Sequence, residues 1–253
     1  MSRSGQNRRS NDRRQEAARL AAEQQARRRR ERRILVAFVG ALVLLVVGGD
    51  IGLQAWRTKR APSAPAAVVQ VADVPQALVD GQPIRFGAAA APATVALYED
   101  FRCSHCADFE EEFGPLLSRA QQAGTAQLEV YPMAFVVAGS SPRAANAMGC
   151  ATEAGFGQRY HHGLFANPTL EWNDGQLLEL AGVVGESATE EFSSCVRTGA
   201  KAGWVASIDA VAERNGVEQT PTVFLDGAPV QLEGLTPEEL QAMIDSATPA
   251  QAK

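Results

Sequence analysis

The sequence has few of the residues that mark several classes of small protein. Only four cysteines occur among 253 residues, and 45% of the residues are hydrophobic, which argues against a disulfide-rich miniprotein and against a disordered chain. A single cysteine pair has CxxC spacing, whereas a zinc knuckle needs two such pairs. The chain also lacks internal repeats with periods of about 20 to 50 residues. Its length therefore suits one ordinary domain with extensions.

Charge is distributed unevenly along the chain. Residues 1–33 contain twelve Arg and four acidic residues, a balance of +8, whereas the remaining residues sum to −13. This basic segment has no aromatic residue that could stack on a base and no zinc or helix-turn-helix pattern, so we expect no binding of nucleic acid. We expect it instead to orient the chain in a membrane and to attract anionic lipid.

An apolar segment follows the basic tail. Residues 34–49 carry no charged or polar side chain, and a helix from Ile34 to Trp56 would span about 35 Å, enough to cross a bilayer. The alternative is a cleaved signal peptide, but its basic region of 33 residues would be unusually long. Because the Arg excess precedes the segment, we expect a cytoplasmic N-terminus and an extracytoplasmic remainder.

These patterns divide the chain into five parts. We assign residues 1–33 to an Arg-rich cytoplasmic tail, 34–56 to a transmembrane signal-anchor helix, 57–77 to an Ala/Pro-rich linker, 78–247 to a folded domain and 248–253 to a C-terminal tail. Within the domain, strand patterns occur at residues 84–86, 94–98, 127–131 and 222–225, and helical patterns fill about 141–200. The order β-α-β, helices, β-β-α predicts an α/β, thioredoxin-like fold with a helical insertion.

The CxxC pair is the main candidate for chemistry. Cys103 follows a buried strand and opens a helix, where free N–H groups and the helix dipole favour a thiolate. Cys106 comes one turn later on the same face, close enough to form a disulfide with Cys103 and to resolve a mixed disulfide. His105 is expected to stabilise the Cys103 sulfur, which would make the pair an oxidant. A structural disulfide or half a zinc site is the alternative.

Thr220-Pro221 is the second candidate feature. Pro221 directly precedes the strand at 222–225, a position where a proline removes no sheet hydrogen bond. A cis bond there would expose the backbone of Thr220 beside the cysteine pair, where it could pair with a substrate strand. Few X–Pro bonds are cis, so this expectation rests on the context rather than on the proline alone.

The remaining cysteines and two adjacent histidines have simpler explanations. Cys150 and Cys195 lie 45 positions apart in the helical block, and we expect them to form a structural disulfide in an oxidising compartment. Free thiols or a second redox relay are the alternatives. His161 and His162 would point about 100° apart on a helix, so they are expected on the surface or in packing, and no metal site is expected.

Several motifs together resemble the DsbA-like branch of the thioredoxin superfamily, and more closely its membrane-anchored bacterial members. The resemblance covers about residues 78–247 and rests on four stretches: 80–87, 91–95, 100–106 (Asp-Phe-Arg-Cys-Ser-His-Cys) and 220–227 (Thr-Pro-Thr-Val-Phe-Leu-Asp-Gly). CxxC followed by Thr-Pro is specific, whereas CxxC alone is not. The resemblance implies a nucleophilic Cys103, a resolving Cys106 and a cis Pro221 that contacts substrate.

Two departures from the family pattern matter. Reducing thioredoxins usually have Trp before the first cysteine and Gly-Pro between the pair, whereas this chain has Arg102 and Ser104-His105. Many relatives also place a buried acid where this chain has Leu97, so Glu99, Asp100 or water would have to exchange the proton of Cys106.

We therefore expect an extracytoplasmic thiol–disulfide oxidoreductase in a bacterial cell membrane. It would oxidise cysteines of exported proteins, use no cofactor besides the Cys103–Cys106 disulfide, and depend on a membrane redox partner that restores this disulfide. A disulfide isomerase or reductase of the same fold is one alternative. A membrane-tethered binding module without turnover is the other, although such a module would tolerate loss of the CxxC and Thr-Pro motifs.

Overall fold

A computed structural model describes residue 65 and residues 76–247 of the chain. The described residues belong to one compact unit, which spans residues 62–253. No helix in this described part is both long and apolar enough to cross a membrane. The tail at 1–33, the membrane helix at 34–56, most of the linker and the end at 248–253 lie outside the described residues, so they stay predictions.

A mixed five-stranded sheet forms the centre of the domain, in the order β1-β3-β2-β4-β5. It consists of β1 (Ile84–Phe86), β2 (Ala93–Glu99), β3 (Ala126–Pro132), β4 (Thr222–Leu225) and β5 (Ala228–Pro229). β2 and β3 run parallel, as the predicted crossover requires, and the other pairs are antiparallel. Val95 and Leu97 on one face of β2 are at most 1% exposed, and Tyr98 on the other face is 2% exposed, so the strand is buried on both faces where these residues lie.

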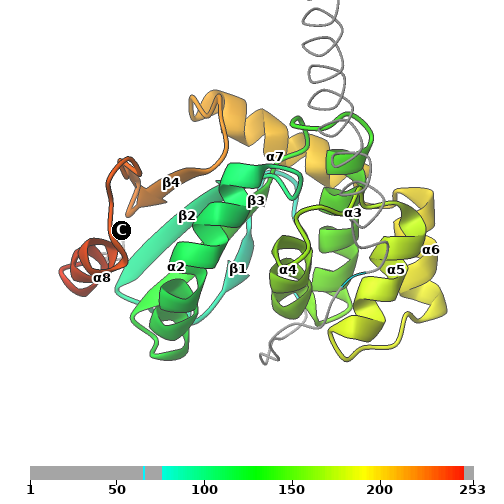
Figure 1. Cartoon of the computed structure of the whole chain (residues 1–253), viewed down its shortest axis with the longest axis horizontal. Helices are drawn as coiled ribbons and strands as arrows, with labels where there is room; N and C mark the ends of the chain where they lie inside the picture. The colour runs from blue at the N-terminus through cyan, green and yellow to red at the C-terminus, as the bar shows by residue number, and fades with distance from the viewer. Residues whose placement is uncertain (1–64, 66–75, 248–253) are drawn as a thin grey trace, which may run out of the picture. The chain divides into compact units, whose positions relative to one another are not determined.

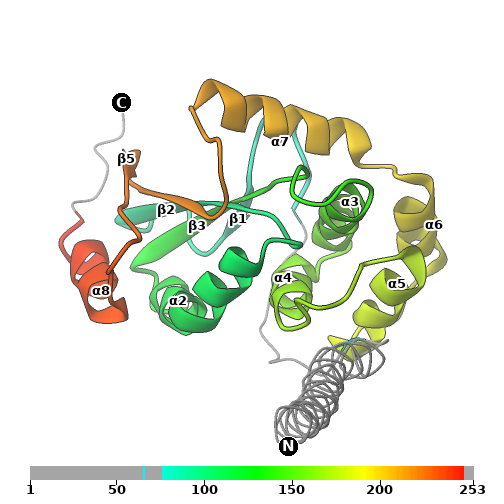
Figure 2. The ribbon, with the colours of Figure 1, turned by 45° about the horizontal axis from the view of Figure 1, so that its top comes forward.

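Helices cover both faces of the sheet. Figure 2 shows α7 (Ala202–Arg214) on one side and both α2 (Ser104–Gln122) and α8 (Pro237–Asp245) on the other. The remaining helices gather beside the sheet (Figure 1): α3 (Ser140–Glu153), α4 (Gly157–Phe165), α5 (Asp174–Val183) and α6 (Glu190–Thr198). The expected α/β, thioredoxin-like architecture is therefore present, with a block of helices between β3 and α7.

Local sequence signals explain where several helices begin. Thr236 caps α8, its side chain accepts from the N–H of Glu239, and the Glu239 carboxylate accepts from the N–H of Thr236, so the predicted capping box is formed. α3 begins at Ser140, close to the predicted start of the helical region at about residue 141. Pro142 lies in its first turn, where a missing N–H removes no helical hydrogen bond, and it therefore does not delay the helix.

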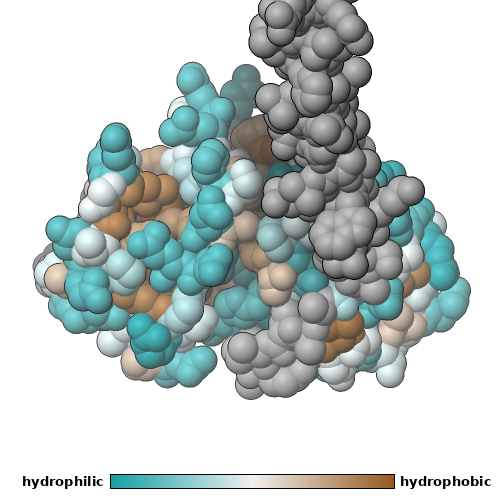
Figure 3. All heavy atoms as spheres, viewed as in Figure 1, coloured by the Kyte–Doolittle hydropathy of each residue, from teal (hydrophilic) through white to brown (hydrophobic). Residues whose placement is uncertain are grey.

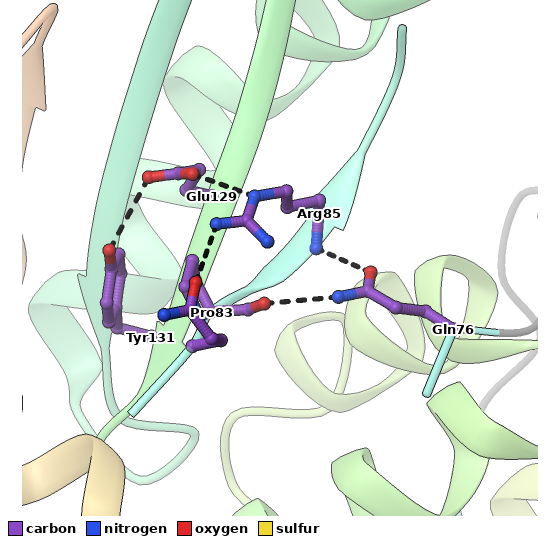
Figure 4. Close-up of polar contacts among 6 residues, drawn as sticks. Gln76, Pro83, Arg85, Glu129 and Tyr131 are labelled. Carbon is purple, nitrogen blue, oxygen red and sulfur yellow. Dashed lines mark hydrogen bonds and ion pairs between the residues drawn. The ribbon is translucent and has the colours of Figure 1, made fainter. Parts of the chain in front are cut away.

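The free edge of the sheet is covered by polar contacts (Figure 4). The Gln76 side chain accepts from the N–H of Arg85 at 2.7 Å and donates to the carbonyl of Pro83 at 3.1 Å, so it takes the place of a further strand beside β1. The Arg85 guanidinium also pairs with Glu129 of β3 at 2.9 Å. These contacts protect the edge strand from pairing with another chain.

The face that contains α2 and α8 is mostly hydrophilic where side chains can be seen in Figure 3, with apolar side chains in small groups between polar ones. Among the described residues, the large apolar side chains that remain exposed are those of Val79, Phe135 and Val136. The last two lie in the loop between β3 and α3, and this loop is tied to the candidate site described next.

Candidate active site

The cysteine pair lies where β2 passes into α2. β2 ends at Glu99, and a turn closed by a 2.9 Å hydrogen bond from the Cys103 N–H to the Asp100 carbonyl leads into the helix. Cys103 is the N-cap residue with an extended backbone (φ −86°, ψ 119°), and its side chain makes no capping hydrogen bond. The first N–H groups of α2 therefore remain available to a negative charge on the sulfur, as the sequence predicted.

The two thiols are free and differ in exposure. Cys103 is partly buried, whereas Cys106, one turn further along α2, is fully buried at 0% exposure. This asymmetry separates their roles, because only Cys103 can be approached by a sulfur from another protein.

A third segment closes the site. The Thr220–Pro221 peptide bond is cis, and the Cys103 thiol donates a hydrogen bond to the Thr220 carbonyl oxygen at 3.3 Å. β4 begins directly after this bond and pairs with β2, with Tyr98 opposite Thr222. The sheet thus brings together the two motifs that are 117 positions apart in the sequence.

The site favours a thiolate at Cys103 over one at Cys106. The pKa of Cys103 is lowered to about 5, chiefly by a hydrogen bond from Cys106 and further by the Thr220 side chain and the backbone N–H groups of Cys106 and His105, against an opposing effect of burial. Burial raises the pKa of Cys106 above the ordinary range, helped by its bond to Cys103 and by the negative charge of Glu99. The reduced pair therefore carries its charge on the accessible sulfur.

His105 is placed differently from the other predicted site residues. Its side chain is 83% exposed, and its Nδ1 lies 3.8 Å from Asp108. The contribution of His105 to Cys103 comes from its backbone N–H. A catalytic role for the imidazole itself stays a prediction.

Two buried acidic residues, Glu99 and Glu110, lie near the Cys103–Cys106 pair. Leu97 is 1% exposed, as befits an apolar core residue, and Glu99 is fully buried two residues later. Burial raises the pKa values of Glu99 and of Glu110 in α2 to about 8 each. His161 of α4 lies against them, with Nε2 at 3.1 Å from Oε2 of Glu99, and burial lowers its pKa.

Asp100, the other acid considered beside the pair, has a structural role. Its buried carboxylate accepts hydrogen bonds from the N–H groups of Arg102, Phe135 and Val136 at 2.8, 3.1 and 3.0 Å and from the Ser141 hydroxyl at 2.7 Å. It therefore joins the turn before Cys103 to the β3–α3 loop and to the start of α3.

The guanidinium of Arg102 makes a further link to the helical block. It donates to the carbonyl oxygens of Pro168 and Leu170, between α4 and α5. Arg102, which occupies the position of Trp in reducing thioredoxins, thus attaches the active-site turn to the helices.

The second cysteine pair lies outside this site. Cys150 of α3 and Cys195 of α6 form a disulfide with a Cα–Cα distance of 6.0 Å, which joins two helices of the block. Its place away from Cys103 and Cys106 fits a structural bond.

The sequence predicts most residues of the site but not the side chains that contact them. Glu110 had one detectable signal, because it lies four positions after Cys106 and next to Phe109, on the face of α2 that is buried. Its contact with α4 depends on how the helices pack.

Comparison with known proteins identifies the family and the fold of this chain. The model of the family described as Thioredoxin matches residues 79–246. Reduced DsbG, a disulfide bond oxidoreductase from Mycobacterium tuberculosis, is 26% identical with a TM-score of 0.58, covering 67% of this chain and 89% of that one. Reduced DsbA from the same organism is 25% identical with a TM-score of 0.57, covering 66% and 92%.

A third structure is similar in fold. MdbA, a thiol-disulfide oxidoreductase from Actinomyces oris, is 22% identical with a TM-score of 0.58, covering 70% of this chain and 91% of that one. A search of curated proteins gave no match. The chain belongs to the thioredoxin family and has the fold of DsbA-like thiol–disulfide oxidoreductases.

Proposed function

We propose that this protein oxidises cysteines of exported proteins outside the cytoplasm, with its N-terminus anchored in the bacterial cell membrane. The observation that carries the proposal is the asymmetry of the pair beside the cis Pro221: the accessible Cys103 favours the thiolate, and the buried Cys106 favours the thiol. Stabilising the reduced pair in this way makes reduction of its disulfide more favourable, which is the property of an oxidant.

The reaction begins with the Cys103–Cys106 disulfide. A client thiolate attacks the Cys103 sulfur, so the bond to Cys106 breaks and a mixed disulfide forms between Cys103 and the client. A second client thiolate then attacks the client sulfur of this mixed disulfide and releases Cys103. The client loses two electrons and two protons. One proton ends on Cys106, and the other goes to solvent because Cys103 leaves as a thiolate.

Thr220 is suited to hold the client during these steps. Its carbonyl oxygen already accepts from Cys103 at 3.3 Å, so it lies at the place where the client backbone must approach the sulfur. We expect an extended client segment to pair with this backbone. A redox partner in the membrane would then reoxidise the pair, and the basic tail at 1–33 would contact anionic lipid.

The reduction potential tests the proposed direction. Equilibration of the protein with glutathione, read by alkylation, should give a value nearer that of a strong oxidant, about −120 mV, than that of thioredoxin, about −270 mV. A value below about −250 mV would favour the reductase alternative. Failure of the oxidised protein to transfer its disulfide to a reduced, unfolded client would instead favour a binding module.

A further inference from the structure

A group of metal-ligand side chains lies outside the cysteine pair. Glu110 of α2 and both His161 and His162 of α4 place donor atoms within 4.8 Å of one another. Successive helical residues diverge by about 100°, so two adjacent histidines alone do not readily share an ion. The packing of α2 on α4 changes this, because it brings a carboxylate from a second helix close to a ring nitrogen of each histidine.

These three side chains also line a small internal cavity. Its other walls are largely apolar and come from the sheet and from α2. Phe86, Leu97 and Leu128 form part of the sheet side. Glu110 and His162 in addition line a larger open groove of about 500 Å³ between α2 and the end of α4. The cluster therefore has a confined space and a route to solvent, both of which a metal site requires.

The buried carboxyl groups at this position lack a cationic partner among the described lysines and arginines. Glu99 is fully buried, one of its oxygens contacts His161 at 3.1 Å, and the other, Oε1, has no hydrogen-bond partner within the described part of the chain. Among the described residues, neither Glu99 nor Glu110 forms an ion pair with lysine or arginine. Burial makes the charged carboxylate form unfavourable here, and a divalent ion would displace the proton and supply the opposite charge that this form needs.

We propose that Glu110, His161 and His162 bind a divalent transition-metal ion of the zinc class, and that the Glu99 carboxylate positions the ring of His161. Two imidazoles and one carboxylate are a ligand set that Zn²⁺ accepts, at about 2.0–2.2 Å, with a fourth position for water. Donors around such an ion lie about 3.5 Å apart, so binding would draw the three side chains together by about 1 Å. A carboxylate that holds a ligating histidine is a usual feature of these sites.

Metal titration of the full chain in detergent, without an affinity tag, tests the proposal. The Cys103–Cys106 pair is kept as the disulfide, so that its thiols cannot bind the ion. We expect calorimetry with Zn²⁺ to give one site with a dissociation constant of about 10 µM or lower. Co²⁺, followed by its visible absorption, should compete for the same site.

Substitutions locate the ion. Glu110→Gln and His162→Gln should each weaken Zn²⁺ binding by at least about 100-fold, and Glu99→Gln by about 10- to 100-fold. His105→Asn is the matched control, because His105 is the third of the three histidines in the chain and is exposed beside Asp108. It should leave binding unchanged. His162 is only partly buried, so His162→Gln decides the result if the Glu110 variant fails to fold.

Two results would overturn the proposal. One is binding weaker than about 100 µM in the unsubstituted protein. The other is binding that survives His162→Gln but is lost in His105→Asn, which would place the ion at the exposed His105–Asp108 pair.

Discussion

The charge on Cys103 determines how the reduction potential of the pair should change with pH. Reduction of a disulfide to two thiols takes up two protons, so the potential falls by about 59 mV per pH unit. The pKa of Cys103 is about 5, whereas the pKa of Cys106 lies above the ordinary range. Above pH 5, reduction therefore takes up one proton, and the potential should fall by only about 30 mV per pH unit.

The same pKa gives the size of the effect. At pH 7 a pKa of about 5 in place of 9.0 corresponds to at most about 2.7 kcal/mol in favour of the reduced folded state. Cys103 is partly exposed and solvent screens its contacts, so we take about half of this, ~1.4 kcal/mol or ~30 mV. Because the folded pKa is the lower one, the stabilisation is complete above pH 9, decreases as the pH falls, and is lost below pH 5.

Glutathione equilibration of a variant that lacks Cys150 and Cys195, carried out between about pH 4 and pH 8, measures both slopes. His105→Pro removes the N–H that favours the Cys103 thiolate, so it should move the change in slope to higher pH and lower the potential at pH 7. His105→Ala keeps this N–H and should behave like the unsubstituted protein. A constant slope of about 59 mV per unit up to pH 7 would refute the reasoning.

Three further outcomes follow from the described contacts. Cys106→Ser should accumulate mixed disulfides with a client on non-reducing gels, whereas Cys103→Ser should form none; equal trapping by both would contradict their assigned roles. Replacing Cys150 and Cys195 by Ala should lower the free energy of unfolding in urea by up to about 4 kcal/mol, because their disulfide closes a loop of about 46 residues; unchanged stability would exclude a structural role. Asp100→Asn should cost about 2–4 kcal/mol in the same assay, because an amide NH₂ would face N–H donors, and a loss below about 0.5 kcal/mol would contradict this.

Local features of this protein could be read from the sequence, whereas long-range contacts could not. Cys103 at the start of α2 and Thr236 at the start of α8 follow from neighbouring residues, because caps and turns depend on a few positions. The contact of Glu110 with α4 joins segments about 50 positions apart and depends on helix packing. The sequence suggested Asp100 only as a possible proton acceptor, since its four donors come from three separate segments.

The hydrogen bonds of Asp100 have a consequence for local opening of the domain. The N–H of Arg102, immediately before Cys103, shares this carboxylate with the first turn of α3. The helical block therefore cannot swing away from the sheet without breaking hydrogen bonds to the carboxylate that also holds the amide next to the reactive sulfur. Hydrogen exchange at Phe135 and Val136 should then report one common opening event rather than two independent ones. The free energy of this opening would then also limit how often the turn before Cys103 loses its contacts with the helices.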